Sequence, residues 1–142
     1  MTFIEALYGS QYYEIQKQGK DGNKGRKNGN IFLSAFTIVV IFIIIMICIK
    51  FIPGFNESIT RSIRKIFGYS SGRSIGKLLA IPLFAIIYFI IAFTIGNEKN
   101  FRKVSEAFME LPDKEKKKAN KIVLIPFFIL LAMLLFLAIS SL

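Results

Sequence analysis

The sequence predicts an all-α integral membrane protein with three transmembrane helices. More than half of its 142 residues, 54%, are apolar, and the mean hydropathy is +0.53, which is more apolar than a soluble domain of this length. A bilayer core of about 30 Å is crossed by roughly 20 apolar residues at about 1.5 Å each. Three stretches of about that length follow one another along the chain: residues 31–52, 78–95 and 122–142.

Each of the three stretches is apolar on every side, as helices that face lipid are. In residues 31–52 the only charged side chain is Lys50, just before the Pro53-Gly54 pair that ends the stretch. This stretch is longer than the apolar region of roughly 7–15 residues in a secretory signal, and it begins farther from the N-terminus. It is therefore predicted to be a retained transmembrane helix.

Charge predicts the orientation, because Lys and Arg concentrate in short cytoplasmic connections. Three spans would place residues 1–30 and 96–121 on the same side of the membrane. These two segments contain 13 of the 19 Lys and Arg residues. The other six lie in or beside residues 53–77. We therefore expect a cytoplasmic N-terminus and an outside C-terminus, in a bacterial inner membrane as the Ile- and Lys-rich composition suggests. The six cations on the outer side leave the inverted topology open.

Residues 1–30 are predicted to form a cytoplasmic amphipathic helix and a Gly/Lys-rich loop. Thr2 and Glu5 have the spacing of a capping box that starts a helix over residues 3–16. The apolar residues that recur on one face of this helix are Ile4, Leu7, Tyr8, Tyr12 and Ile15. We interpret this face as lying on the membrane interface or a partner subunit, with packing on the chain's own bundle as the alternative. The glycines and asparagines of residues 19–30 predict a flexible basic connector.

Residues 53–77 are predicted to be a basic amphipathic connection on the membrane surface. A helix over residues 57–67 places Ile59, Ile63 and Ile66 on one stripe. The cations of this helix that we expect to contact anionic lipid headgroups are Arg61, Arg64 and Lys65. Three glycines then recur every four residues, which is the spacing of a helix-packing ridge and equally suits a hinge: Gly68, Gly72 and Gly76.

Residues 96–121 are predicted to be a charged helical connection. Asn97 can cap a helix over residues 98–111, and Pro112 begins another helix that continues into the third span. The lysines of that helix that we expect on anionic lipid headgroups are Lys116, Lys117 and Lys118. The net charge of +10 is therefore assigned to the membrane surface. Nucleic acid is not an expected partner, because the aromatic or Arg-rich recognition patterns are absent from the sequence.

Composition argues against most catalytic and metal chemistry. The chain has no His and one Cys, Cys48, so it contains no Cys/His zinc set and no Ser-His-Asp triad. All nine acidic residues lie outside the three spans, most of them among Lys and Arg as on solvated helix faces. The spans hold no ionisable residue apart from Lys50 near an end, so no proton or ion path is expected in a single chain. We predict a non-enzyme with no cofactor and no metal.

These features together predict a small non-catalytic integral membrane subunit that packs against a larger membrane protein complex and stabilises or regulates it. Its expected partners are membrane lipids and either that larger protein or further copies of the same chain. A small homo-oligomeric channel or carrier, whose pore several copies would line, is the first alternative. A pore-forming lysis protein or toxin is the second, because the size and the basic surface suit one.

Overall fold

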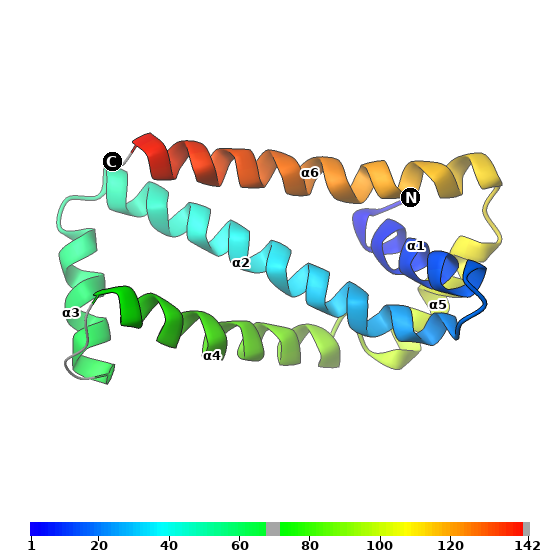
Figure 1. The fold of residues 1–142 in the computed structure, drawn as a ribbon, viewed down its shortest axis with the longest axis horizontal. Helices are drawn as coiled ribbons and strands as arrows, with labels where there is room; N and C mark the ends of the chain where they lie inside the picture. The colour runs from blue at the N-terminus through cyan, green and yellow to red at the C-terminus, as the bar shows by residue number, and fades with distance from the viewer. Residues whose placement is uncertain (68–71, 141–142) are drawn as a thin grey trace.

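The structure, a computed structural model, describes residues 1–67 and 72–140, with side chains described for residues 1–66 and 80–140. Within these ranges every regular element is a helix. In chain order (Figure 1) they are α1 (Phe3–Lys17), the short 3-10 helix η1 (Gly22–Lys24), α2 (Gly25–Phe51), α3 (Phe55–Phe67), α4 (Gly72–Phe93), α5 (Glu98–Met109) and α6 (Asp113–Ser140). The three shorter α-helices lie within two residues of their predicted bounds.

Three long helices, α2, α4 and α6, run along the length of the molecule. α2 and α6 run in the same direction and α4 runs in the opposite one (Figure 1); α2 packs against both of the others. Gly22–Phe51 and Asp113–Ser140 are long and apolar enough to cross a membrane, and a third candidate is the pair Ala80–Phe93 and Glu98–Met109, whose two helices are bent by 67°. Over the described residues the chain is thus all-helical, with two to three candidate membrane-spanning helices.

The shorter helices gather at the two ends of the long ones. At one end α1 packs against α5 and against the first turns of α2 and α6 (Figure 1). We call this assembly the cap and define it as residues 1–34, which hold α1, η1 and the first turns of α2, together with residues 94–123, which hold α5 and the first turns of α6. At the opposite end α3 runs across the ends of the long helices and contacts α2.

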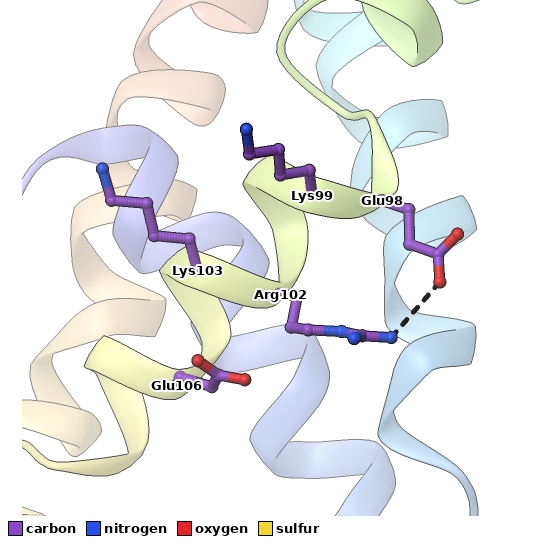
Figure 2. A pocket seen from close by; sticks show the side chains of 5 residues that line it. All are labelled: Glu98, Lys99, Arg102, Lys103 and Glu106. Carbon is purple, nitrogen blue, oxygen red and sulfur yellow. Dashed lines mark hydrogen bonds and ion pairs between the residues drawn. The ribbon is translucent and has the colours of Figure 1, made fainter.

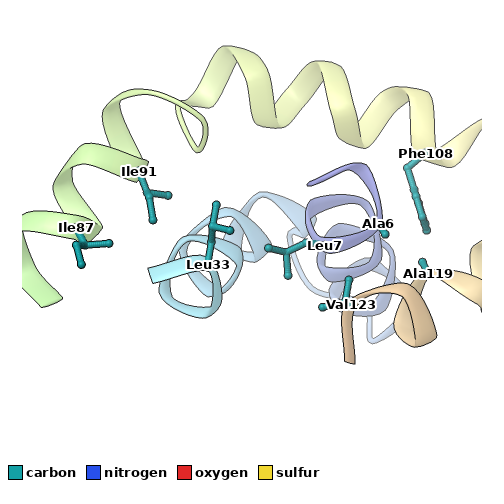
Figure 3. Packing of buried hydrophobic residues seen from close by; sticks show 8 residues of the cluster. All are labelled: Ala6, Leu7, Leu33, Ile87, Ile91, Phe108, Ala119 and Val123. Carbon is teal, nitrogen blue, oxygen red and sulfur yellow. The ribbon is translucent and has the colours of Figure 1, made fainter. Parts of the chain in front are cut away.

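The buried core lies in and beside the cap. Its residues come from five helices (Figure 3): Ala6, Leu7, Leu33, Ile87, Ile91, Phe108, Ala119 and Val123. Away from the cap the long helices expose their apolar side chains, so that only 17% of the apolar stretch of α2 and 6% of that of α6 are buried within the chain. Such exposure is typical of helices whose solvent is lipid rather than water.

Two predicted helix caps are confirmed. At the start of α1 the Thr2 hydroxyl accepts a hydrogen bond from the N–H of Glu5 at 3.2 Å, and the N–H of Thr2 donates to Glu5 Oε2 at 2.7 Å. At the start of α5 the Asn97 side chain accepts a hydrogen bond from the N–H of Asn100 at 2.8 Å. Both caps satisfy backbone donors that the first turn of a helix leaves unpaired.

Replacing Thr2 with alanine is expected to speed hydrogen exchange in the first turn of α1, because losing an N-cap hydroxyl costs about 1 kcal/mol. The hydrogen bond from the Thr2 N–H holds the pKa of the Glu5 carboxyl below its usual value. Such a carboxylate stabilises the fold above its unfolded pKa, and this stabilisation is lost as the pH falls through the lower, folded pKa. The first turn should therefore loosen in acid in the wild type and in the Glu14→Gln control, but less so in Glu5→Gln, which has no carboxyl to protonate at this position. Equal acid sensitivity in all three proteins would contradict this account.

The structure differs from the predicted flexible loop over residues 19–30, because α2 begins at Gly25 and not at residue 31. The glycines here allow close packing against α1. A Cβ on Gly25 would lie 2.9 Å from the backbone carbonyl carbon of Gln11, and one on Gly29 would lie 2.6 Å from the Tyr8 ring. Small residues let two helices approach closely, so this segment is part of the cap and not a free connector.

Candidate functional site: the cap and the two membrane surfaces

A chain of hydrogen bonds inside the cap joins three segments that are distant in the sequence. The Tyr8 hydroxyl of α1 donates to Oδ1 of Asn30 in α2 at 2.6 Å, and Nδ2 of Asn30 donates to the carbonyl of Gly96, after α4, at 3.3 Å. Tyr8 is fully buried and Asn30 is 3% exposed. Because an unpaired buried polar group costs about 1–3 kcal/mol, these bonds fix α1 against α2 and against the turn between α4 and α5.

Tyr8 is enclosed on several sides by neighbouring helices. Its ring meets Phe101 of α5 edge to face at a centroid distance of 5.7 Å, while Gly29 leaves the space that the ring occupies against α2. Burial raises the pKa of Tyr8 to about 12, and the nearby Tyr88 adds to the rise. At neutral pH the phenol is therefore protonated and serves as a hydrogen-bond donor.

Two further glycines allow equally close contacts in the cap. A Cβ on Gly9 would overlap the ring of Phe108, and one on Gly96 would overlap the Asn30 side chain and crowd the Tyr8 hydroxyl. The tight fit explains why five consecutive residues of α1, from Ala6 to Ser10, are all buried. α1 is thus an internal element of the cap.

The apolar face predicted on the N-terminal helix packs largely within the chain. Leu7 and Tyr8 are buried, whereas Ile4, Tyr12 and Ile15 are half-buried. For Leu7 and Tyr8 the expected contact with a membrane or a partner is therefore corrected: α2, α5 and α6 surround α1 and cover these side chains. Helical periodicity shows that a face needs covering but does not identify what covers it.

The cations predicted to contact anionic lipid lie at opposite ends of the molecule. The set on α3 is Arg61, Arg64 and Lys65, and the set on α6 is Lys116, Lys117 and Lys118. All are exposed except Lys116, which is half-buried and whose Nζ lies 5.4 Å from the centre of the Tyr13 ring, a cation–π contact within the cap. Lys116 is thereby held against α1, while the other five are open to solvent or headgroups.

The outer face of α5 forms a shallow depression of about 460 Å³ (Figure 2). Charged residues of both signs line it: Glu98, Lys99, Arg102, Lys103 and Glu106. Arg102 and Glu98 form an ion pair at 3.4 Å, one helical turn apart and largely exposed, so the pair contributes less than about 1 kcal/mol. The side chains extend in different directions along the helix (Figure 2), as on a solvated helix face.

Hydroxyl groups on α2 and directly after α4 hydrogen-bond to backbone carbonyls of the same helix. Ser34, Thr37 and Thr94 each donate to the carbonyl four residues earlier, at 2.7, 2.8 and 2.6 Å. These hydroxyls are therefore satisfied without water or a transported ion. Within residues 1–66 and 80–140, no three His, Cys, Asp or Glu side chains gather as a metal site requires.

Of the glycines predicted as a packing ridge or hinge, Gly68 lies outside the described residues. Gly72 and Gly76 fall in the first turns of α4, so the backbone is helical there. Both lie outside residues 1–66 and 80–140, the ranges in which side-chain packing is described. Sequence reasoning missed the role of Asn30. The available signal was the helical spacing of Gly22, Gly25 and Gly29, which marks one face of a helix.

Comparison with known protein families, with curated proteins and with solved structures gives no match for this chain.

Proposed function

We propose that the chain is a three-span, non-catalytic subunit that packs against a larger membrane protein complex and stabilises or regulates it. The direction of the long helices supports three spans. α2 and α6 both begin in the cap and run toward the end where α3 lies (Figure 1). If both cross a bilayer, the chain must return between them, and α4 is the helix that returns. Its 22 residues extend about 33 Å, enough to cross the hydrocarbon core.

One observation favours a subunit over a self-contained membrane protein: the spans form an open layer fixed at one end. Among the described residues, α4 and α6 pack on α2 rather than on each other. Their outer side chains are therefore uncovered, as at Phe93, which is 78% exposed, and Phe136, which is 69% exposed. The rigid cap holds this layer in place without a closed bundle, so two apolar faces are presented to a partner in the membrane.

A role as a single-chain channel receives less support from the same geometry. The hydroxyls of Ser34 and Thr37 bond to their own helix. The apolar stretches 31–52, 78–95 and 122–142 carry no charged residue apart from Lys50, near the end of α2. Ion and proton pathways through membranes use such residues or water-filled cavities. A structural or regulatory role needs neither.

The proposed orientation places the cap in the cytoplasm and α3 outside, because the cap segments carry 13 of the 19 cations. In a Cys48→Ser background, we expect a membrane-impermeant maleimide to label Glu57→Cys in right-side-out vesicles. Gln18→Cys should react only after permeabilisation. Both positions are exposed. The reverse pattern would invert the topology, and labelling of both positions from the same side would contradict a membrane-crossing α2, the long helix that separates them.

The subunit role is tested by purifying the tagged protein from its native membranes in mild detergent, with native mass determination. A larger membrane protein in fixed stoichiometry is expected. The retention of this larger protein should depend on one outer face of the chain. Phe89→Ala/Phe93→Ala on α4 should therefore weaken its retention while Phe128→Ala/Ile129→Ala on α6 does not, or the reverse.

Two other outcomes would overturn the subunit role. A defined homo-oligomer that conducts ions in liposomes would support the channel alternative. Collapse of the membrane potential on expression of this chain alone would support the lysis alternative.

A further inference from the structure

The three shorter α-helices were all predicted to be amphipathic, but their apolar faces have different surroundings. In α1 and α5 the largest apolar side chains are enclosed within the cap, as at Leu7, Phe101 and Phe108, each at most 2% exposed. In α3, Ile59 is only half-buried and Ile66 is 75% exposed. The apolar face of α3 is therefore not covered by the described part of the chain and requires another apolar environment.

The position of α3 identifies that environment. The chain turns at Pro53 and Gly54, where Gly54 adopts a left-handed φ of +77° that an L-residue rarely adopts. α3 then runs across the ends of the long helices instead of extending them (Figure 1). A helix placed across the ends of membrane-spanning helices lies along the membrane surface.

The charges of α3 fit an anionic surface. The isoleucines at positions 59, 63 and 66 share one face, since they are separated by four and three residues. Arg61, Arg64 and Lys65 are exposed away from that face, and Glu57 is the acidic residue of the helix. Arginine and lysine chains can extend from an interfacial helix to phosphate groups while the apolar side faces the acyl chains.

We infer that α3 lies in the plane of the membrane surface on anionic lipid, with its isoleucines among the upper acyl chains and its three cations at the headgroups. α1 and α5 are not interfacial helices of this kind, because their apolar faces are used inside the cap. The inference depends on the membrane insertion in the proposed function but not on the subunit role.

The chain contains no tryptophan, so one introduced tryptophan is a unique fluorescent reporter. The full-length variants Ile63→Trp, Glu57→Trp and Ile86→Trp are each reconstituted in vesicles of phosphatidylcholine and phosphatidylglycerol with brominated acyl chains. The indole of Ile63→Trp should be quenched most by bromines near the headgroup. The indole of Glu57→Trp, on the opposite face of α3, should be quenched less, although loss of the Glu57 charge favours lipid binding. The indole of Ile86→Trp, on the exposed face of α4, should be quenched most by deep bromines.

The electrostatic part is tested in the Ile63→Trp protein by comparing brominated phosphatidylglycerol with brominated phosphatidylcholine at equal fractions. Each cation near a charged leaflet can favour the anionic lipid by up to about fivefold. The preference should fall toward one in Arg61→Gln/Arg64→Gln/Lys65→Gln. It should persist in the matched cap variant Lys99→Gln/Arg102→Gln/Lys103→Gln, which removes the same charge from α5.

The outcomes separate this inference from the proposed function. Quenching in Ile86→Trp without quenching in Ile63→Trp would leave membrane insertion intact and overturn the placement of α3 on lipid. α3 would then lie on protein instead. Absence of quenching in both variants would overturn the spans themselves. Quenching in Ile63→Trp with no preference for phosphatidylglycerol would overturn the anionic-lipid contact.

Discussion

Replacing Gly29 with alanine is expected to destabilise the cap, although glycine-to-alanine replacement at an exposed helix position stabilises by about 1 kcal/mol. The new Cβ would lie 2.6 Å from the Tyr8 ring, and that ring is fully buried. Overpacking of a filled core costs about 1–3 kcal/mol, which exceeds the gain in helix propensity over most of this range. Gly29→Leu adds a larger side chain at the same point and should displace α1 altogether.

The measurement is the thermal midpoint of the protein in mild detergent, together with hydrogen exchange of the α1 amides. Asn28→Ala is the matched control, because Asn28 is the preceding residue of the same helix turn and is exposed. It should leave α1 protected. Asn28→Ala can raise the midpoint through helix propensity alone. If Gly29→Ala raised it in the same way, residues 25–30 would be a solvated helix end, and α1 and α2 would not be in close contact there.

The fold was largely predictable because the length and hydropathy of a transmembrane segment can be recognised without knowing its neighbours. Residues 31–52 and 122–142 carry this signal, and α2 and α6 include nearly all of both. Local chemistry also determined two helix starts, since Thr2 with Glu5 and Asn97 are caps whose partners lie three residues away. In each case the determining interaction is within one element.

The arrangement of the cap could not be predicted in the same way, because it depends on contacts between elements. Leu7 and Tyr8 have the same helical spacing whether lipid, a partner or α5 covers them. The Asn30 side chain bonds to Tyr8 and Gly96, positions 22 residues before it and 66 after it. In sequence, Asn30 ends a run of glycines, asparagines and lysines that reads as a loop. The same glycines, once α1 is placed beside them, become the surface that it packs on.

Replacing Asn30 with alanine is expected to destabilise the protein by about 2–6 kcal/mol, because two buried groups lose their partner at a cost of roughly 1–3 kcal/mol each. These are the Tyr8 hydroxyl and the Gly96 carbonyl. α1 and the turn after α4 should both lose protection from hydrogen exchange. Asn28→Ala again serves as the control, since it removes an exposed asparagine from the same helix.

A double-mutant cycle with Tyr8→Phe separates the hydrogen bond from general damage to the cap. Tyr8→Phe alone should cost about 1–2 kcal/mol, because it leaves the buried Oδ1 of Asn30 unpaired. In the Asn30→Ala background it should cost nothing or restore stability, because it removes the hydroxyl that Asn30→Ala leaves unpaired, so the coupling energy should be at least as large. Additive losses would show that Tyr8 and Asn30 stabilise the cap independently, contrary to the 2.6 Å contact between them.

Burial of the Tyr8 phenol predicts an alkaline transition. Because the folded pKa of Tyr8 is raised to about 12, the folded state keeps this proton at pH values where the unfolded chain has lost it. Stability from this group is therefore complete below the unfolded pKa of about 10 and decreases as the pH rises from there through the folded value. Tyr8→Phe should be less stable near neutral pH but should lose less stability between pH 10 and about 12. Parallel losses in the two proteins would mean that the Tyr8 phenol is open to water, which its complete burial between α1, α2 and α5 does not allow.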